Sequence, residues 1–386
     1  GGYALTLPSD GTMTANAKIW LERIRDLSLP ERVKIMNVCG GHERSITMSG
    51  LRGALPAEIE LVPGPGCPVC ICPEEDVYEA IQLALNEDII LVAFGDMLRV
   101  PVNVPRGAAR SLEHAPAPAA EIPPVATPMD LAQSARDPPD RPVVFFAAGF
   151  ETTPAPVAAM LVEGVPENLL VLLSGRLTWP AVAMLLDSGK PGFDALVAPG
   201  HVSTVMGPED WDFVVDRHGI PAAVAGFTPE SLLAAMYSVL RQLREGRYFL
   251  DNCYPDLVRS GGNPLAQQHL GEAMQVVDAN WRGVGVIPAS GYAIRDRYRA
   301  HDARLRFPSY ADDSRKRAGE MPPGCDCAQV VLGKIYPNEC RLYGAGCNPR
   351  NPIGPCMVSD EGACRIWWAG GVREPASAQR RTGADA

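Results

Sequence analysis

Thiol groups are the most prominent reactive side chains of this sequence, and most of them fall in two short windows. Of 11 cysteines in 386 residues, four lie between residues 39 and 72 and six lie between residues 325 and 364; only Cys253 stands apart. An odd, clustered number in a long chain is typical of metal binding or thiol chemistry and not of a disulfide scaffold.

The first window contains two motifs. Cys39 and His42 flank two glycines. A thiolate and an imidazole at this spacing can bind a transition metal, or the imidazole can activate the thiol; the alternative is a buried cysteine beside a helix-capping histidine. Cys67 and Cys70 form a C-x-x-C motif, whose spacing allows a disulfide, a redox pair or half of a zinc site. Cys72 adds a third sulfur or simply points into the core.

The second window holds six cysteines within 40 residues, which packing alone does not explain. Four thiolates for an iron–sulfur cluster plus a spare pair would account for the number, and zinc held by four thiolates is the alternative. The spacing matches neither of the common ferredoxin patterns, so it does not decide which four bind. Cys340 and Cys347 are the strongest candidates. Cys325 or Cys327, and Cys356 or Cys364, would complete the set.

Short apolar runs bounded by Gly or Pro alternate with amphipathic stretches, which indicates βαβ units with parallel sheets. The predicted strands are Val33–Val38, Ile59–Val62, Ile89–Phe94, Val143–Ala148, Leu169–Leu173, Ala195–Ala198, Ala222–Ala225 and Val284–Ile287. The predicted helices are Asp76–Asn86, Pro156–Glu163, Ala181–Asp187 and Pro229–Arg244. Within the Pro- and Ala-rich residues 102–142, a short strand near Pro123–Ala126 and a helix over Met129–Arg136 are expected.

The fold class predicted from these elements is α/β, with two tandem Rossmann-like parallel-sheet domains and a smaller cysteine-rich iron–sulfur domain. The two α/β domains are expected at residues 31–138 and 139–245, and the cysteine-rich domain at residues 246–386. Residues 1–30 are expected to form a helical segment that packs on the cysteine-rich domain. The tail after Arg373 is expected to be frayed.

Unusual residues directly follow four of the predicted strands. The four segments are Cys39–Glu43, Pro63–Cys72, Gly149–Pro154 and Pro199–Thr204. In open α/β sheets, ligands bind outside the carboxyl ends of the strands. The four segments are therefore expected to meet in one cleft.

Two of these segments supply further candidates. Glu151, Thr152 and Thr153 lie in a strand-to-helix turn that can hold a small anion or cap the following helix. His201 is a candidate general acid/base or metal ligand, or else a satisfied loop histidine, and Ser203 follows it. We expect these residues to support the site.

Composition excludes several classes of function. The formal net charge of −10 disfavours nucleic acid as a partner because the surface repels phosphate. No apolar run approaches the roughly 20 residues of a membrane span, and no secretory leader is evident. The sequence therefore predicts a cytoplasmic protein with neither a nucleic-acid nor a membrane partner.

Taken together, the motifs resemble those of the HypD family of [NiFe]-hydrogenase maturation proteins. The matching stretches run in order from about residue 20 to residue 368. They are Cys39-Gly40-Gly41-His42, Gly64-Pro65-Gly66-Cys67-Pro68-Val69-Cys70, Phe94 to Pro101, Gly149 to Thr153, Pro199 to Ser203, Trp281-Arg282-Gly283, Cys356 to Ser359 and Glu361 to Cys364.

The resemblance implies a redox-active scaffold for metallocentre assembly. It implies a [4Fe–4S] cluster near a thiol pair and a small HypC-type partner, with which iron acquires two cyanides and one carbonyl. A HypE-type partner would donate the cyanide from a thiocyanate-like group on a cysteine. By position, Cys39 would bind the transient Fe(CN)2CO iron with support from His42, and Cys67 and Cys70 would be the redox pair between cluster and iron.

Two segments depart from the family pattern. Glu43-Arg44 stands where Thr and often a second His are expected, and Ser174-Gly175-Arg176 replaces an Asn/Ser-His segment. Two other classes of function compete with the family's. One is a stand-alone cluster-dependent thiol–disulfide reductase resembling ferredoxin:thioredoxin reductase, and the other is a zinc-stabilised binding module.

Overall fold

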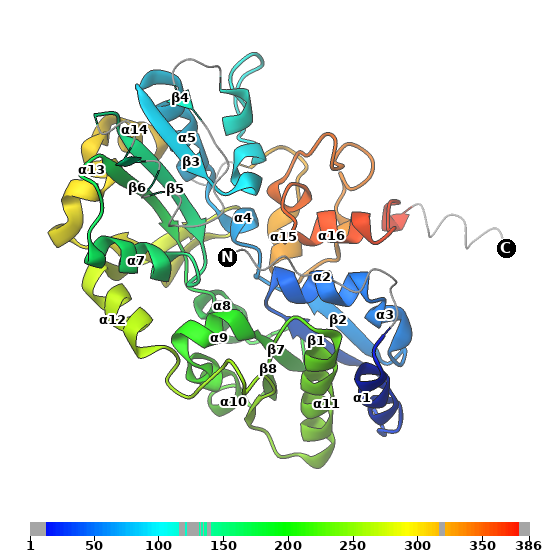
Figure 1. Cartoon of the computed structure of the whole chain (residues 1–386). Helices are drawn as coiled ribbons and strands as arrows, with labels where there is room; N and C mark the ends of the chain where they lie inside the picture. Colours follow the sequence, from blue (N-terminus) through cyan, green and yellow to red (C-terminus); the bar gives the residue numbers. More distant parts are fainter. Residues whose placement is uncertain are drawn as a thin grey trace.

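Two parallel sheets, an antiparallel hairpin and a cysteine-rich segment make up the chain in the computed structural model (Figure 1). The structure describes residues 13–115, 120–121, 131, 133, 135–136, 140–315 and 321–377. The α/β class and the parallel pairing predicted from the sequence are confirmed.

The first sheet has the strand order β2-β1-β7-β8-β9, and all its neighbours pair in parallel. Alternate strand residues face opposite sides, so each face has its own core. One face packs against α1, α2, α3 and α11, and the other against α8 and α10. The strands are β1 (Val33–Asn37), β2 (Ile59–Pro63), β7 (Ala195–Pro199), β8 (Ala222–Ala225) and β9 (Leu250–Asn252). The helices are α1 (Ala15–Arg25), α2 (Gly40–Met48), α3 (Leu51–Ala54), α8 (Trp179–Asp187), α10 (Asp212–Asp216) and α11 (Pro229–Glu245).

The second sheet has the parallel order β4-β3-β5-β6, and its three longer strands are buried along their whole length. Burial of both faces explains their unbroken apolar sequences. One face packs against α4 and α5, and the other against α7, α12 and the hairpin. The strands are β3 (Ile89–Ala93), β4 (Ala120–Glu121), β5 (Val143–Gly149) and β6 (Leu169–Gly175). The helices are α4 (Pro68–Ile71), α5 (Glu74–Asn86), α7 (Pro154–Glu163) and α12 (Pro264–Ala273).

The hairpin pairs β10 (Met274–Trp281) with β11 (Gly285–Ile294) and contacts β6 and α8. The cysteine-rich segment, residues 321–377, lies beside both sheets (Figure 1, orange to red). The other short helices are α9 (Gly200–Met206), α13 (Ala303–Arg306), α14 (Pro308–Arg315), α15 (Cys327–Val331), α16 (Ala363–Ala369), η1 (Gly95–Arg99), η2 (Leu112–His114), η3 (Pro208–Trp211), η4 (Asp296–His301), η5 (Pro337–Glu339) and η6 (Pro355–Met357).

The predicted tandem arrangement is wrong, because each sheet takes strands from both predicted ranges. β1 pairs with β7, and β3 pairs with β5 across the expected boundary at residue 138. The second sheet is inserted in the chain between β2 and β7. The run predicted as a strand at Val284–Ile287 belongs to the antiparallel hairpin and not to a parallel sheet.

Among the described residues, two segments nearer the ends of the chain also differ from expectation. Helix α1 packs on α11 of the first sheet, where Trp20 and Tyr237 have ring centroids 5.5 Å apart, and not on the cysteine-rich segment. The block predicted as one domain at residues 246–386 is divided, since β9 joins the first sheet and α12 packs on α7.

Some predictions fall on parts of the chain that the structure does not describe. The strand near Pro123–Ala126 lies outside the described residues, as do residues 378–386 of the predicted frayed tail and part of the helix over Met129–Arg136. Within the described residues, no helix combines the length and apolarity needed to cross a bilayer.

Candidate thiol and metal site

A cleft of about 530 Å³ lies where the carboxyl ends of strands from the two sheets meet. Its lining includes Cys39 after β1, Gly66 after β2, the η1 segment after β3, the Thr152–Thr153 pair after β5 and His201 after β7. The prediction that these loops share one cleft is therefore confirmed.

Cys39 is the residue immediately before α2, at the wall of this cleft. Desolvation, with a smaller contribution from the Glu361 carboxylate, raises the pKa of its thiol to about 12. The backbone N–H groups of His42 and Gly41, at the start of α2, act in the opposite direction. Cys39 is therefore a neutral thiol at pH 7 unless a cation replaces its proton, as a metal does.

The two glycines after Cys39 serve close packing. A Cβ at Gly40 would lie 2.5 Å from Cβ of Glu361, and a Cβ at Gly41 would lie 2.5 Å from the ring of Phe227. Neither glycine adopts a left-handed conformation. Their role is to let Glu361 and Phe227 approach the start of α2, which spacing alone did not indicate.

His42 is fully buried on α2 and does not line the cleft. Its Nε2 lies 2.9 Å from the carbonyl oxygen of Ala225, and burial lowers its pKa to about 4. The ring is therefore neutral, with Nε2–H donating to that carbonyl. Its Nδ1 is buried and has no hydrogen-bond partner among the described residues. Metal-binding histidines usually donate their second N–H in this manner, which leaves the other nitrogen for the metal.

His201 lines the same cleft against an aromatic wall. Its ring centroid is 4.1 Å from that of Phe227, and burial lowers its pKa. The His42 ring also packs on Phe227, with ring centroids 5.6 Å apart, so both imidazoles contact the same aromatic side chain. His201 can therefore accept a proton or offer a nitrogen lone pair to a ligand in the cleft.

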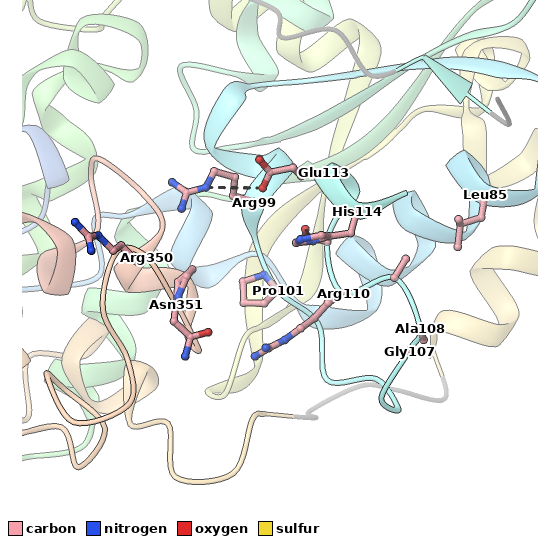
Figure 2. Close-up of a pocket in the computed structure, with 13 residues that line it drawn as sticks. Leu85, Arg99, Pro101, Gly107, Ala108, Arg110, Glu113, His114, Arg350 and Asn351 are labelled. Carbon is pink, nitrogen blue, oxygen red and sulfur yellow. Dashed lines mark hydrogen bonds and ion pairs between the residues drawn. The ribbon is translucent and has the colours of Figure 1, made fainter. Parts of the chain in front are cut away.

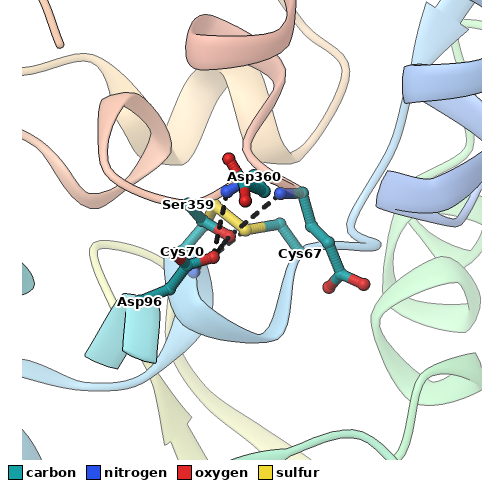
Figure 3. The surroundings of a disulfide bond; sticks show 6 residues. Cys67, Cys70, Asp96, Ser359 and Asp360 are labelled. Atoms are coloured by element: carbon teal, nitrogen blue, oxygen red, sulfur yellow. Dashed lines mark hydrogen bonds between the residues drawn. A yellow bond between two sulfur atoms is a disulfide. The ribbon is translucent and has the colours of Figure 1, made fainter. Parts of the chain in front are cut away.

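Cys67 and Cys70 form a disulfide around the single turn of α4 (Figure 3). Both residues are buried. Beside the bond, Asp96 of η1 accepts hydrogen bonds from the backbone of Asp360 at 3.0 Å and from the Ser359 hydroxyl at 3.4 Å. This contact fixes the 359–361 loop of the cysteine-rich segment against the second sheet.

Glu361 belongs to this loop and is not among the site residues predicted from the sequence. It lines the cleft and is almost wholly buried, and burial raises the pKa of its carboxyl to about 7, with smaller effects from Asp96 and Asp360. The signal available was its place in the Glu361–Cys364 stretch, which gave no indication of a contact with Cys39.

A narrow space of about 10 Å³, enough for roughly one water molecule, separates the thiols of Cys39 and Cys356 from the disulfide. Cys39, the two disulfide cysteines, Cys356 and Glu361 all border it. Gly66 makes this approach possible, because a Cβ there would lie 2.4 Å from the backbone nitrogen of Cys39. The structure thus brings together thiols that are more than 300 residues apart in the chain.

The six cysteines of the second window belong to the core beside the second sheet, five of them buried and Cys325 half-buried, and we call this region the cysteine pocket. The side chains of Cys325, Cys327, Cys356 and Cys364 interact in succession, and each shifts the pKa of its neighbour. The charges of Cys340 and Cys347 reach Cys364, and Sγ of Cys347 accepts a hydrogen bond from the Ile353 N–H at 3.3 Å. The choice of four ligands among the six stays a prediction.

This pocket suits an iron–sulfur cluster by the chemistry of its donors. Among the described residues, no group of three or more Cys, His, Asp or Glu side chains is already spaced around a metal position; the thiols contact one another instead. A Cβ at Gly354 would lie 2.3 Å from Sγ of Cys327 and 2.6 Å from Sγ of Cys325. The loop therefore leaves room for sulfur only because residue 354 has no side chain.

Replacing Gly354 by alanine is accordingly expected to reduce the iron content and visible absorption of the anaerobically purified protein by more than half. Gly346→Ala is the matched control in the same loop, because a Cβ there meets only Ile353, at an ordinary 3.6 Å. Equal iron content in the two variants would contradict the assignment of this pocket.

Of the supporting residues predicted at the third and fourth motifs, only some reach the cleft. Thr152, Thr153 and His201 line it. The carboxylate of Glu151 is buried behind it and accepts hydrogen bonds of 2.7 Å from both the N–H and the hydroxyl of Thr178. Ser203 is buried in α9 and does not line the cleft. Glu151 thus fixes the start of α8.

Glu151 is expected to make folding stability depend on pH. Burial raises the pKa of its carboxyl from 4.5 to about 7, against the effect of its bonds to Thr178. The unfolded state therefore loses this proton at lower pH than the folded state does. As pH rises from 4.5 to about 7, the free energy of unfolding falls by about 3 kcal/mol. Glu151→Gln cannot ionise and should lose this dependence in urea unfolding measured below pH 4.5 and above pH 7. The exposed Glu163→Gln on α7 should behave like wild type.

The two departures from the family pattern occupy structural positions. Glu43 accepts hydrogen bonds from Asn37 at 2.8 Å and Trp367 at 2.9 Å, and pairs with Arg52. It therefore ties α2 to the cysteine-rich segment.

Arg176 is buried and donates to the carbonyl oxygen of Asn280, which ties β6 to the hairpin.

Cys72 is buried with its Sγ 3.5 Å from the Ser174 hydroxyl, and burial raises its pKa to about 12. Cys253 lies at the edge of the first core, which is the core between the first sheet and helices α1, α2, α3 and α11. None of these residues lines the cleft.

A cleft between two parallel sheets that is lined by a cysteine and a histidine, and that adjoins a disulfide and a cysteine-rich segment, defines an α/β protein with a thiol-rich site. The chain belongs to the HypD family. The model of that family, described as "Hydrogenase formation hypA family", matches residues 15–371.

Several curated proteins are similar over most of their length. Hydrogenase maturation factor HypD of Rhodobacter capsulatus is 40% identical over 347 residues, which cover 88% of this chain and 90% of that protein. HypD of Azotobacter vinelandii is 37% identical, covering 94% and 96%. HypD of Escherichia coli is 37% identical, covering 87% and 88%.

Proposed function

We propose that this chain is a hydrogenase maturation factor that serves as scaffold and redox catalyst for the Fe(CN)2CO group. It works with a small HypC-type partner and accepts cyanide from a HypE-type donor. The observation that carries this proposal is the narrow space bordered by Cys39, the Cys67–Cys70 disulfide and Cys356. A metal-binding thiol, a two-electron couple and the cysteine pocket are in contact there.

Cys39 and His42 would hold the iron that is the cargo of the reaction. Thiolate and imidazole suit ferrous iron, and cyanide and carbonyl as further ligands suit a low-spin ferrous centre held by a soft donor. The buried, unpartnered Nδ1 of His42 supports this role. The cleft of about 530 Å³ leaves space for a segment of the HypC-type partner on the iron's open side.

Cys67 and Cys70 would supply the electrons for cyanide release. A thiocyanate on the donor's cysteine needs two electrons to yield a thiol and cyanide. The reduced pair provides two electrons and two protons: the S–CN bond breaks, one proton goes to the donor sulfur and one balances the cyanide, and the Cys67–Cys70 S–S bond forms. Each cyanide therefore consumes one dithiol, and the oxidised pair matches the disulfide of the structure.

The six cysteines of the second window would hold a [4Fe–4S] cluster through four of their thiolates. Such a cluster, when bound, supplies one-electron redox chemistry. The chain's own contribution is placement, since Cys356 borders the same space as the disulfide. Gly354 leaves room there for the sulfur atoms of Cys325 and Cys327.

A stand-alone thiol–disulfide reductase is less consistent with this geometry. Both disulfide cysteines are buried, and neither lines the cleft. A protein substrate of a reductase would need direct access to one sulfur.

Infrared spectroscopy tests the proposal. The protein is purified without oxygen from cells that co-express its HypC- and HypE-type partners, and the spectrum is scanned for cyanide and carbonyl stretches. Bands from both ligands are expected. A brown protein that lacks both sets of bands would instead favour the reductase.

A further inference from the structure

A second hollow, of about 750 Å³, lies apart from the cleft, between residues 99–114 and the 350–352 loop (Figure 2). We call it the arginine groove. No residue lines both the groove and the cleft. Figure 2 shows Arg99 and Arg110 on one segment and Arg350 on another that is distant in the sequence, and all three line the groove.

The groove is basic on an acidic protein. Three arginines and His114 line it against one carboxylate, Glu113, while the whole chain carries −10. Arg99 is committed to structure, because it donates to the Pro349 carbonyl at 3.1 Å and lies 4.0 Å from Glu113. Arg110 and Arg350 are exposed and form no ion pair with any residue that the structure describes.

The groove adjoins the cysteine pocket. Arg350, Asn351 and Pro352 line it and follow Cys347 by only a few residues. The amide of Asn351 donates to the Gly346 carbonyl at 3.2 Å, and the Ile353 N–H donates to Sγ of Cys347 at 3.3 Å. A molecule seated on this loop is therefore one layer of residues away from the thiols.

We propose that the arginine groove is the docking site of an acidic one-electron carrier protein that restores the Cys67–Cys70 dithiol. This inference rests on the proposed function, which consumes one dithiol for each cyanide released. Two carrier molecules, each oxidised by one electron, and two protons from solvent convert the disulfide into two thiols. Because the groove and the cleft share no residue, the carrier and the iron-site partner can bind together.

The positive charge of the arginine groove indicates that its partner is acidic. Opposite charges steer protein association and set its dependence on salt, and free arginines are the side chains that best engage surface carboxylates. The proximity of the cysteine pocket selects a redox protein among acidic partners, because electron transfer requires close approach.

Binding of a plant-type [2Fe–2S] ferredoxin, as the acidic probe, tests the groove directly. The holoprotein carrying Arg110→Glu and Arg350→Glu is expected to bind it at least tenfold more weakly than wild type at low ionic strength, with a flatter salt dependence. The matched control is Arg247→Glu with Arg259→Glu, two exposed residues with the same charge change that flank β9.

Equal ferredoxin affinity in the two double variants would overturn the docking site. Counting free thiols then separates this inference from the proposed function. Reduced ferredoxin should produce the Cys67 and Cys70 thiols in wild type and at least tenfold more slowly in the groove variant, whereas dithionite should produce them equally in both. A disulfide that dithionite leaves intact in both proteins would contradict the proposed redox role, while the binding comparison would still decide the groove.

Discussion

Replacing Cys39 by alanine is expected to abolish hydrogenase maturation while leaving iron and visible absorption in the cysteine-rich segment unchanged. The variant lacks the only thiolate that the cleft offers to iron among the described residues, and His42 alone is a weak anchor. The measurement is hydrogenase activity in cells lacking the native gene, with iron content and visible spectra of the purified variant.

Cys253→Ala is the matched control for this prediction. Cys253 is likewise a free, partly buried cysteine, but it lies at the edge of the first core, away from the cleft. It should mature hydrogenase like wild type. Maturation by Cys39→Ala would remove the assignment of the iron site to this cleft.

Replacing Cys67 by serine is expected to reduce maturation to the background of cells without the gene. The remaining Cys70 thiol cannot supply two electrons by forming an intramolecular disulfide, so cyanide release stops. The effect on folding should be smaller, because a disulfide that closes such a short loop contributes about 2 kcal/mol. Urea unfolding of oxidised wild type and the variant measures that difference.

Cys72→Ser separates redox chemistry from the loss of any thiol in this segment. Cys72 is buried next to Ser174, outside the disulfide and outside the narrow space. Its serine variant should retain most of the wild-type activity. If Cys67→Ser matures hydrogenase as well as Cys72→Ser does, the disulfide has no role in the reaction.

The sequence predicted the elements of the fold better than their partners. The apolar runs at β3, β5 and β6 are buried on both faces, so they stand out from local composition alone. Because strands of both sheets have similarly apolar sequences, the sequence does not indicate which strands belong to the same sheet. Pairing of β1 with β7, more than 150 residues away, depends on packing across the whole core. The tandem arrangement failed for this reason.

The sequence predicted site residues whose type itself indicates chemistry. It did not predict residues whose properties arise only from packing in the folded protein. Cys39 and Cys67 could be predicted because each belongs to a short cysteine motif, and such motifs are uncommon. Glu361 is an ordinary glutamate in the sequence and acquires its raised pKa only through burial beside Asp96 and Asp360. Glu151 was conspicuous by its motif, yet its carboxylate serves Thr178 behind the cleft.

The neighbouring positions of β1 and β2 have a consequence for motion. Cys39 and Cys67 leave adjacent, hydrogen-bonded strands of one sheet, and the Gly40 N–H donates to the Gly66 carbonyl at 3.1 Å. This bond and the β1–β2 ladder fix the distance between the two turns that carry Cys39 and Cys67. Partners that enter and leave the cleft can therefore displace its other walls, while the separation between the proposed iron-binding sulfur and its proposed electron source stays constant.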